Sequence, residues 1–240
     1  DYQPLPGGFL YAQPGECEAL ERLAAEHPCA AILFEAVQGE GGVRPIGQEF
    51  ASCLQEVCRK HDLLLMADEV QLGNGRSGSL YGYMNYGLQP DVVSTAKGIG
   101  GGLPLGVTMF GERVADVFHP GDHGTTFGGN HLACAAAIAV ADVMVADRLV
   151  DHARELGGYL IGELKKLPRV KEVRGRGLMI GVELFEDAAP LRRKLLFDEK
   201  IFVGSSGDKN TFRLLPALNI GREHADRLLE ALRKLLTTSC

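Results

Sequence analysis

The chain has 240 residues, of which 45% are hydrophobic and 23% are charged, as in ordinary globular proteins. This composition excludes disordered, collagen-like and coiled-coil proteins, and no apolar run reaches the roughly 20 residues that a membrane-spanning helix needs. The formal net charge of −6 argues against a general role on nucleic acids or on membrane surfaces.

The charge is distributed unevenly along the chain. Residues 1–150 carry 8 Lys or Arg and 18 Asp or Glu, a net −10, whereas residues 151–240 carry 17 and 13, a net +4. Such a change in composition predicts a boundary, which we place between two domains, residues 1–149 and residues 150–240. The alternative is that the basic C-terminal residues merely form a solvated face.

The start of the chain and its cysteines bear on where the protein acts. The first residues, DYQPLPGG, lack the basic and apolar segments of a secretory signal, and the missing initiator Met points to processing or to a fragment. None of the 6 cysteines forms a CxxC pair or a metal-ligating spacing with histidine. We therefore expect reduced cysteines that act as small hydrophobic residues, no metal site and a cytoplasmic location.

The first half of the chain alternates short apolar runs with an amphipathic helix. Residues 30–35 (AAILFE) are typical of a strand that is covered on both faces. Apolar residues at helical spacing predict a helix over residues 47–61. Further strands are predicted over residues 63–67, 92–95 and 106–110. Buried strands that alternate with helices predict an α/β fold with a mostly parallel sheet.

A different pattern begins at Asn130, a good helix cap before an Ala-rich segment that predicts a long, closely packed helix. A helical stripe continues from Ala153 to Leu167. The segment VKEVRGRGLMIGVEL predicts two strands around an Arg-Gly-Arg-Gly turn, and residues 212–215 predict another. Apolar residues up to Leu236 predict a final amphipathic helix, so we expect a small α+β domain at the C-terminal end.

Two polar residues stand where apolar strands end. Asp68 follows LLLMA and Lys97 follows DVVSTA, and ligands of open α/β sheets collect at the carboxyl ends of the strands. Glycines after Lys97 let a flat molecule approach the backbone. A confined lysine can act as a Schiff-base nucleophile, and an aspartate can keep a pyridine nitrogen protonated. The pair predicts pyridoxal-phosphate chemistry, with a purely structural ion pair as the alternative.

A glycine-rich segment follows Asp68 and matches a dinucleotide-binding pattern only in its letters. Residues 73–78 read GNGRSG, but the residues after them contain further glycines and a proline and no good helix start. The pyrophosphate of a dinucleotide needs a helix N-terminus at that place. We therefore interpret this segment as a turn-rich loop below the site.

Two further segments predict anion-binding residues. The residues HGTTFGGN, with Thr125 and Thr126, precede the long helix, and hydroxyls and free amides at such a place suit a phosphate or form an ordinary capped loop. Arg213 lies within an apolar strand and needs a carboxylate partner, from a substrate or from a side chain. Glu40, in QGEGG, is the first partner to consider.

These segments, in this order, resemble the class III pyridoxal-phosphate-dependent aminotransferases. The resemblance runs from FEAVQGEGGVRP through LLLMADEVQLGNGRSG and DVVSTAKGIGGGLPLG to HGTTFGGN and FRLLPALNI, and so covers nearly the whole chain. It is strongest to acetylornithine aminotransferases, followed by ornithine and other ω-amino-acid aminotransferases. The resemblance implies fold type I, with residues 1–149 as part of the large cofactor-binding domain, and a homodimer.

The resemblance also implies a cofactor, pyridoxal 5′-phosphate, and residues that hold it. Lys97 would be the internal Schiff-base lysine and the proton shuttle, and Asp68 would pair with the pyridinium nitrogen. Val70 would pack on one face of the ring, and Gln71 would bind its phenolic oxygen. Thr126 would reach the phosphate of the cofactor in the neighbouring subunit.

The implied reaction transfers an amino group from N-acetylornithine or a similar ω-amino acid to 2-oxoglutarate, which gives glutamate, in arginine biosynthesis. Arg213 would bind a substrate carboxylate, Glu40 would pair with Arg213 or gate it, and Thr125 would lie near the substrate. His131 and Ala217 stand where the family usually has proline, at positions without a catalytic role.

One departure from the family is larger. Its members have an additional N-terminal segment with a phosphate loop, an aromatic residue on the other cofactor face and another substrate-binding arginine, so we expect little activity from the 240 residues alone. The alternatives are an ornithine or 4-aminobutyrate aminotransferase, a related mutase or decarboxylase, and a non-catalytic fragment or interaction module. A nucleotide-binding oxidoreductase is the most distant alternative.

Overall fold

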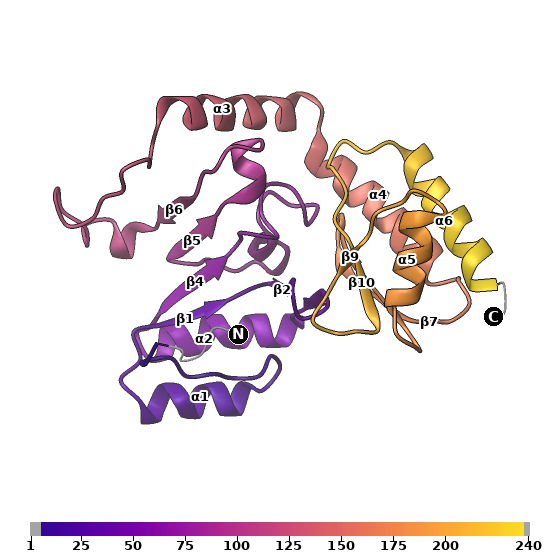
Figure 1. Cartoon of the computed structure of the whole chain (residues 1–240). Helices are drawn as coiled ribbons and strands as arrows, with labels where there is room; N and C mark the ends of the chain where they lie inside the picture. Colours follow the sequence, from indigo (N-terminus) through magenta and orange to yellow (C-terminus); the bar gives the residue numbers. More distant parts are fainter. Residues whose placement is uncertain (1–5, 238–240) are drawn as a thin grey trace.

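The computed structural model describes residues 6–237. Cys240 and the first five residues of DYQPLPGG therefore lie outside the described residues. The first half is built on a four-stranded sheet with the order β1-β4-β5-β6 (Figure 1). Its strands are β1 (Ala31–Phe34), β4 (Leu64–Asp68), β5 (Val92–Thr95) and β6 (Val107–Phe110), which confirms the four predicted strands to within a few residues.

The register of this sheet brings three strand ends to one edge. β1 runs parallel to β4, with Ala31 opposite Leu64, and β4 runs parallel to β5, with Met66 opposite Val92. Only β6, at the end of the sheet, is antiparallel to its neighbour β5. Because β1, β4 and β5 point the same way, the residues that follow them emerge along a single edge.

Helix α2 (Gln48–Lys60) covers this sheet, as the apolar spacing over residues 47–61 predicts. Its buried residues are Phe50, Ala51, Leu54, Val57 and Cys58. They pack into one core with residues of β1 and β4, including the fully buried Leu65. Helix α1 (Cys17–Glu26), which has no counterpart among the predicted elements, lies outside α2 (Figure 1). A short hairpin of β2 (Val37–Gln38) and β3 (Arg44–Pro45) follows β1.

A disulfide contradicts the expectation that all cysteines are reduced. Cys17, in α1, is bonded to Cys53, in α2, whereas Cys29, Cys58 and Cys134 are free thiols. Cysteine spacing along the sequence did not indicate this pair because its partners are 36 residues apart and meet only when α1 packs on α2. The bond therefore cross-links the outer helix to the layer that covers the sheet.

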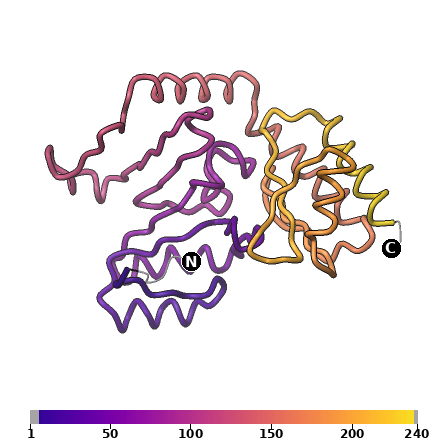
Figure 2. The backbone as a smooth tube through the Cα atoms, viewed as in Figure 1, coloured from indigo at the N-terminus to yellow at the C-terminus, as the bar shows by residue number. Residues whose placement is uncertain are grey.

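The C-terminal part contains a second four-stranded sheet, with the order β7-β8-β10-β9. Its strands are β7 (Val170–Arg176), β8 (Met179–Leu184), β9 (Gly204–Ser205) and β10 (Thr211–Leu214), and the neighbouring strands are antiparallel. The helices α4 (Leu149–Leu164), α5 (Ala189–Phe197) and α6 (Arg222–Thr237) lie with this sheet and share its core (Figures 1 and 2). The strand pair around Arg-Gly-Arg-Gly, the strand near Phe212 and the final helix are confirmed, while α5 and β9 were not predicted.

Helix α3 (His131–Ala146) connects the two parts along one side of the molecule (Figure 2). Its predicted cap is confirmed, because the Asn130 Oδ1 atom accepts the Ala133 N–H at 2.9 Å. Arg148, with φ of +51°, lies between α3 and α4 and is the N-cap residue of α4. Four large apolar side chains of α3 are exposed, namely Leu132, Ile138, Val143 and Val145. None of the helices among the described residues is long and apolar enough to cross a membrane.

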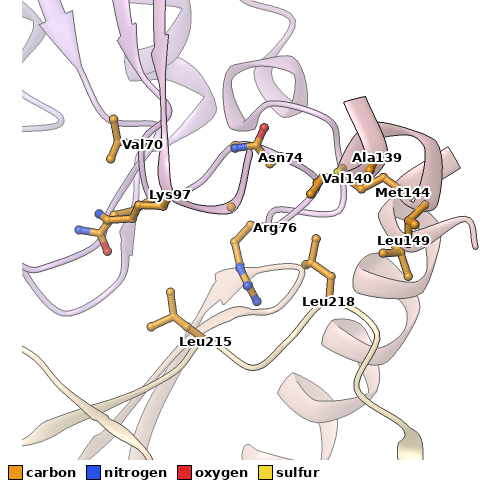
Figure 3. Close-up of a pocket in the computed structure, with 14 residues that line it drawn as sticks. Val70, Asn74, Arg76, Lys97, Ala139, Val140, Met144, Leu149, Leu215 and Leu218 are labelled. Atoms are coloured by element: carbon orange, nitrogen blue, oxygen red, sulfur yellow. The ribbon is translucent and has the colours of Figure 1, made fainter. Parts of the chain in front are cut away.

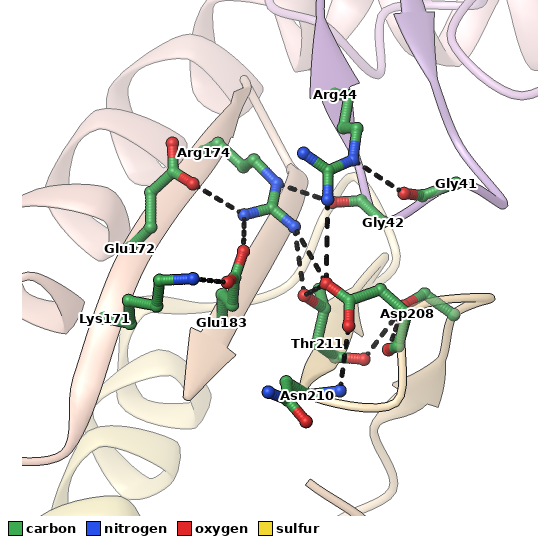
Figure 4. A network of polar contacts seen from close by, with 11 residues as sticks. Gly41, Gly42, Arg44, Lys171, Glu172, Arg174, Glu183, Asp208, Asn210 and Thr211 are labelled. Carbon is green, nitrogen blue, oxygen red and sulfur yellow. Dashed lines mark hydrogen bonds and ion pairs between the residues drawn. The ribbon is translucent and has the colours of Figure 1, made fainter. Parts of the chain in front are cut away.

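A buried arginine ties the β2–β3 hairpin to the second sheet (Figure 4). Arg174, in β7, donates from Nε to the Gly42 carbonyl oxygen at 2.8 Å, and Gly42 lies in the hairpin after β1. The same guanidinium pairs with Glu183 of β8 and donates to Thr211 Oγ1 at 3.0 Å. Because a buried charge needs this degree of pairing, the network holds the hairpin in one position against β7 and β8.

Glu183 makes this network sensitive to acid. Hydrogen bonds from Lys171 and then from Arg174 hold the pKa of its carboxyl below the usual value of 4.5. The stabilisation is therefore complete above the unfolded-state pKa and is lost as the pH falls through the folded-state value. We expect the free energy of unfolding, measured with urea, to fall below pH 5 less steeply in Glu183→Gln than in the wild type. Parallel curves for the two proteins would contradict this role.

A second buried carboxylate shapes the loop after β4. Glu69 is fully buried, and its two oxygens accept the N–H groups of Gly82 and Tyr83, each at 2.8 Å. These residues begin a 3-10 helix, η1 (Gly82–Tyr86). Burial raises the pKa of the Glu69 carboxyl, and the two N–H groups oppose this shift. The side chain thus satisfies two backbone donors that the short helix leaves free.

Replacing Glu69 with alanine is expected to lower the free energy of unfolding by about 2–4 kcal/mol, since both N–H groups lose their acceptor. Urea denaturation of the two proteins measures the difference. Glu56→Ala, on the exposed side of α2, is the control and is expected to change stability by less than about 0.5 kcal/mol. A Glu69→Ala protein as stable as this control would show that the carboxylate contributes nothing to the loop.

Candidate active site

Three charged residues lie at the common edge of the parallel strands. Glu35 directly follows β1, Asp68 is the last residue of β4, and Lys97 comes two residues after the end of β5. The strand-end pattern singled out Asp68 and Lys97 but not Glu35, although an acidic residue after the apolar run AILF is the same signal. The edge therefore carries two carboxylates and one amine.

Asp68 is half-buried and is held by the turn that follows it. Its Oδ1 atom accepts the N–H of Val70 at 3.0 Å. In the described part of the chain no hydrogen bond to its other oxygen is found. This arrangement fixes the carboxylate and leaves one oxygen for a further donor.

Lys97 is exposed and has an unusual backbone conformation. Its φ of +50° lies in the left-handed region, which costs a residue with a side chain about 1 kcal/mol. The 3-10 helix η2 (Lys97–Gly100) begins at this residue. Gly101, with φ of +59°, follows and packs so closely on α3 that a Cβ atom there would lie 2.9 Å from Val140. Among residues 6–237 no hydrogen-bond or ion-pair partner of the Lys97 amine is found.

The charges at this edge shift the pKa of the Glu35 carboxyl. Burial raises the pKa of its carboxyl, and the negative charges of Asp68 and Glu40 raise it further. The N–H of Gly39, which donates to Glu35 Oε2 at 3.1 Å, and the positive charge of Lys97 oppose this rise. Glu35 therefore interacts electrostatically with both residues that the sequence singled out.

The structure pairs Arg213 with Glu40. The Nη1 and Nη2 atoms of Arg213 donate to the two oxygens of Glu40 at 3.0 and 3.2 Å, and this contact holds the pKa of the Glu40 carboxyl below its usual range. The Arg213 side chain is 13% exposed, whereas that of Glu40 is 72% exposed. Glu40 can therefore swing into solvent and leave the two-pronged donor of Arg213 for another carboxylate.

Gln71 contacts the ion pair of Arg213 and Glu40. Its Nε2 atom donates to Glu40 Oε1 at 3.2 Å. A Cβ atom on Gly39 would lie 2.7 Å from Gln71 Oε1, so a larger residue at this position would displace the end of the Gln71 side chain.

A cavity of about 520 Å³ opens beside Lys97 (Figure 3). Lys97, Val70 and Gln71 line one part of it, and other lining residues come from the GNGRSG loop, from α3, from the start of α4 and from the segment after β10. The remaining lining residues are Gly73, Asn74, Arg76, Gly98, Ala139, Val140, Val143, Met144, Leu149, Leu215 and Leu218. Asp68 and Arg213 are not among the lining residues, so this cavity is one side of the site and not all of it.

Thr125 and Thr126 lie apart from these residues. Both are exposed, in the loop between β6 and α3, and neither lines the cavity. For residues 6–237, no hydrogen bond connects their side chains with Lys97, Asp68 or Arg213. Within this chain the two threonines are therefore not brought to the strand-end edge.

The segment GNGRSG is a turn-rich loop, as predicted, and no α-helix begins after it. It contains a residue that the sequence analysis did not single out. Arg76 donates from Nη1 to the carbonyl oxygens of Leu178, at 3.3 Å, and Pro216. Burial lowers the pKa of its guanidinium to about 10. Its partners lie more than 100 residues away, so no local pattern indicates this bridge.

Comparison with known proteins places this arrangement in a family. A model of that family, described as aminotransferase class-III, matches residues 12–236. The chain belongs to the class-III aminotransferase family. It is 43% identical over 235 residues to an acetylornithine aminotransferase of Aquifex aeolicus, which covers 98% of this chain and 61% of that protein. It is 42% identical over 235 residues to ornithine aminotransferase 2 of Staphylococcus aureus, which covers 97% of this chain and 59% of that protein.

Solved structures of the class-III family share the fold. An ornithine aminotransferase from Toxoplasma gondii has a TM-score of 0.90 and 32% identity, and the match covers 97% of this chain and 57% of that one. An acetylornithine aminotransferase from Elizabethkingia anophelis has a TM-score of 0.83 and 31% identity, over 92% and 58% of the two chains. These likenesses confirm the expected fold type I. The chain spans about three fifths of the length of the curated relatives it matches.

Proposed function

We propose that this chain is the catalytic part of a pyridoxal-phosphate-dependent aminotransferase. The observation that carries the proposal is an amine without a partner, on Lys97, beside the half-satisfied carboxylate of Asp68, at the edge where ligands of such sheets bind. Membership of the class-III family supports it. We further propose that residues 1–149 are part of the large cofactor-binding domain and that residues 150–240 are the small domain.

The donor groups at this edge fit pyridoxal 5′-phosphate. When bound, this cofactor supplies an electron-withdrawing ring that stabilises negative charge on the substrate carbon. Lys97 would hold the cofactor and move the proton at that carbon, and the free oxygen of Asp68 would accept from the pyridine nitrogen. Val70 and Gln71 line the same cavity as Lys97, where Val70 would contact the ring and Gln71 would donate to its phenolic oxygen.

The substrate proposed is N-acetylornithine or a similar ω-amino acid, with 2-oxoglutarate as the acceptor and glutamate as its product. Relatives named acetylornithine aminotransferase, at 40–43% identity, support this choice. The 42% identity to ornithine aminotransferase 2 of Staphylococcus aureus favours ornithine as the second candidate. Arg213 binds a substrate carboxylate when Glu40 releases it. Thr125, which is next to Thr126, lies near the substrate in the site of the neighbouring subunit.

We also propose a homodimer that acts in the cytoplasm in arginine biosynthesis. In this dimer Thr126 reaches the phosphate of the cofactor held by the neighbouring subunit, which accounts for its distance from Lys97 within one chain. The exposed apolar side chains of α3, such as Ile138 and Val145, support a partner surface on this side. A family-type N-terminal segment completes the site, in keeping with the fraction of its relatives that the chain spans.

The proposal is tested with two proteins, the 240 residues alone and the same residues joined to the N-terminal segment of the Aquifex aeolicus relative. Each is supplied with excess cofactor, an amino donor and 2-oxoglutarate, and glutamate formation is measured. We expect turnover from the extended protein, fastest with acetylornithine among acetylornithine, ornithine and 4-aminobutyrate, and little from the 240 residues alone. An extended protein that binds the cofactor and transfers no amino group would overturn the proposal.

Arg213→Lys is expected to raise KM for the amino donor and for 2-oxoglutarate by about 10-fold or more. A lysine supplies a single point charge and cannot donate to both oxygens of a carboxylate. Steady-state kinetics with each substrate varied in turn measure the effect, and the absorbance of the bound cofactor is expected to stay unchanged. Kinetics equal to the wild type with both substrates would exclude Arg213 from carboxylate binding.

A further inference from the structure

The turn-rich loop after β4 reaches the residues directly before Lys97. Asn74, the second residue of GNGRSG, donates from Nδ2 to Thr95 Oγ1 at 2.9 Å and to the Ala96 carbonyl oxygen at 3.2 Å. Thr95 is the last residue of β5, and Ala96 directly precedes Lys97. Asn74 and Lys97 both line the cavity and are labelled in Figure 3.

These two bonds act where the chain leaves its regular structure. The ladder between β5 and β6 ends at Thr95, which lies opposite Val107. Beyond it, the Ala96 carbonyl oxygen accepts the N–H of Ile99 at 3.3 Å, and this bond encloses Lys97 in a tight turn. Asn74 donates to the same oxygen and so fixes the start of the turn from outside. A left-handed residue such as Lys97 persists only where its surroundings hold it in place.

The conformation and the side-chain amide of Asn74 are suited to fixing the start of the Lys97 turn. Its own φ is +55°, a conformation that asparagine tolerates better than most residues with side chains. Its amide nitrogen has two protons, enough for a hydroxyl and a carbonyl acceptor at once. An aspartate of the same shape has no proton to donate to the Ala96 carbonyl oxygen when it is ionised.

We propose that Asn74 is a positioning residue, which holds the turn at Lys97 so that the lysine amine is presented to the cofactor and substrate. This inference rests on the proposed function, since it assigns the lysine a reacting amine. Asn74 itself acts through Thr95 and Ala96. The glycine-rich loop thereby has a part in the site that is unrelated to dinucleotide binding.

The matched control lies 11 positions further along the chain. Asn85 also donates from Nδ2 to a hydroxyl, Ser77 Oγ, and to a carbonyl oxygen, that of Gly82, both at 3.1 Å. Its bonds stabilise the loop around η1 and do not reach the Lys97 turn. A comparison of the two asparagines therefore separates positioning of Lys97 from stability of the loop.

The experiment uses Asn74→Gly, Asn74→Asp and Asn85→Ala in the 240-residue chain and in the extended protein. Glycine removes both bonds and accepts the positive φ without strain, so the loop keeps its backbone conformation. Without cofactor, exchange of the Ile99 amide proton is measured by hydrogen exchange. With cofactor, incorporation of pyridoxyl groups at Lys97 after borohydride reduction is followed by peptide mapping, and kcat and KM are determined.

We expect Asn74→Gly and Asn74→Asp to speed exchange of the Ile99 amide about 10-fold, because the turn opens more easily. Both variants are expected to slow labelling of Lys97 and to lower kcat about 10-fold, with the KM for the amino donor within twofold of the wild type. Asn85→Ala is expected to lower the melting temperature without changing exchange at Ile99 or labelling at Lys97 by more than twofold.

Two results would overturn the inference. One is exchange and labelling within twofold of the wild type in both Asn74 variants. The other is an equal change in Asn85→Ala, which would show that loop stability alone is measured. A wild type that is not labelled at Lys97 would refute the proposed function instead, and exchange at Ile99 would still decide whether Asn74 holds the turn.

Discussion

Replacing Lys97 with alanine is expected to abolish amino transfer by the extended protein, to below about one thousandth of the wild-type kcat. The amine is both the group that holds the cofactor and the group that moves the proton at the substrate carbon, so no other residue at this edge replaces it. Steady-state formation of glutamate measures the loss. Because Lys97 is exposed and its amine has no hydrogen-bond or ion-pair partner among residues 6–237, the melting temperature is expected to change little.

Borohydride reduction provides the direct assignment. In the wild type with pyridoxal phosphate, peptide mapping is expected to find the pyridoxyl mass on Lys97. The exposed Lys209 serves as the control, and Lys209→Ala is expected to retain full activity and labelling. Label on another lysine in the wild type, or an active Lys97→Ala protein, would refute the assignment.

Asp68→Asn is expected to lower kcat by about 100-fold or more while the protein still retains its cofactor. The carboxylate keeps the pyridine nitrogen protonated, which stabilises negative charge on the substrate carbon, and each ~1.4 kcal/mol lost from this stabilisation costs a factor of ten in rate. Asparagine preserves the shape and the acceptor for the Val70 N–H, so the turn after β4 is expected to remain.

The control for this variant lies at the other end of the same strand. Asp62 precedes β4, is exposed and pairs with Arg113, so Asp62→Asn is expected to leave kcat within twofold of the wild type. Cofactor retention is measured by absorbance after gel filtration. If Asp68→Asn turns over like the Asp62→Asn control, the carboxylate has only a structural role.

The residues most readily found from the sequence are those that a pattern of a few neighbouring residues indicates. The apolar run LLLMA marks β4, and VVST, rich in β-branched residues, marks β5. The charged residues after these runs, Asp68 and Lys97, must lie at one edge once the strands are parallel. The same reasoning fits Glu35, which follows β1 and was not singled out. The helical spacing of α2 and the cap at Asn130 are likewise readable within a few residues of sequence.

Other parts of the site exist only through contacts between distant segments. Arg213 needed a carboxylate, but its position inside an apolar strand could not choose between a substrate and Glu40, which lies 173 residues away. The bonds of Asn74 to Thr95 and Ala96 and of Arg76 to Leu178 and Pro216 depend on how loops meet after the strands are placed. Neither residue type signals such a role on its own.

The disulfide between Cys17 and Cys53 likewise depends on a contact between distant segments, since it requires α1 to lie on α2. The sequence by itself therefore determined the four strands of the first sheet, three of the four strands of the second, the helices α2, α3, α4 and α6, and the two residues at strand ends. Hydrophobic periodicity and strand direction are properties of short segments. Only the tertiary structure decided which carboxylate meets Arg213, which amide holds the Lys97 turn and which cysteines are joined. Those choices depend on distances between segments that packing alone brings together.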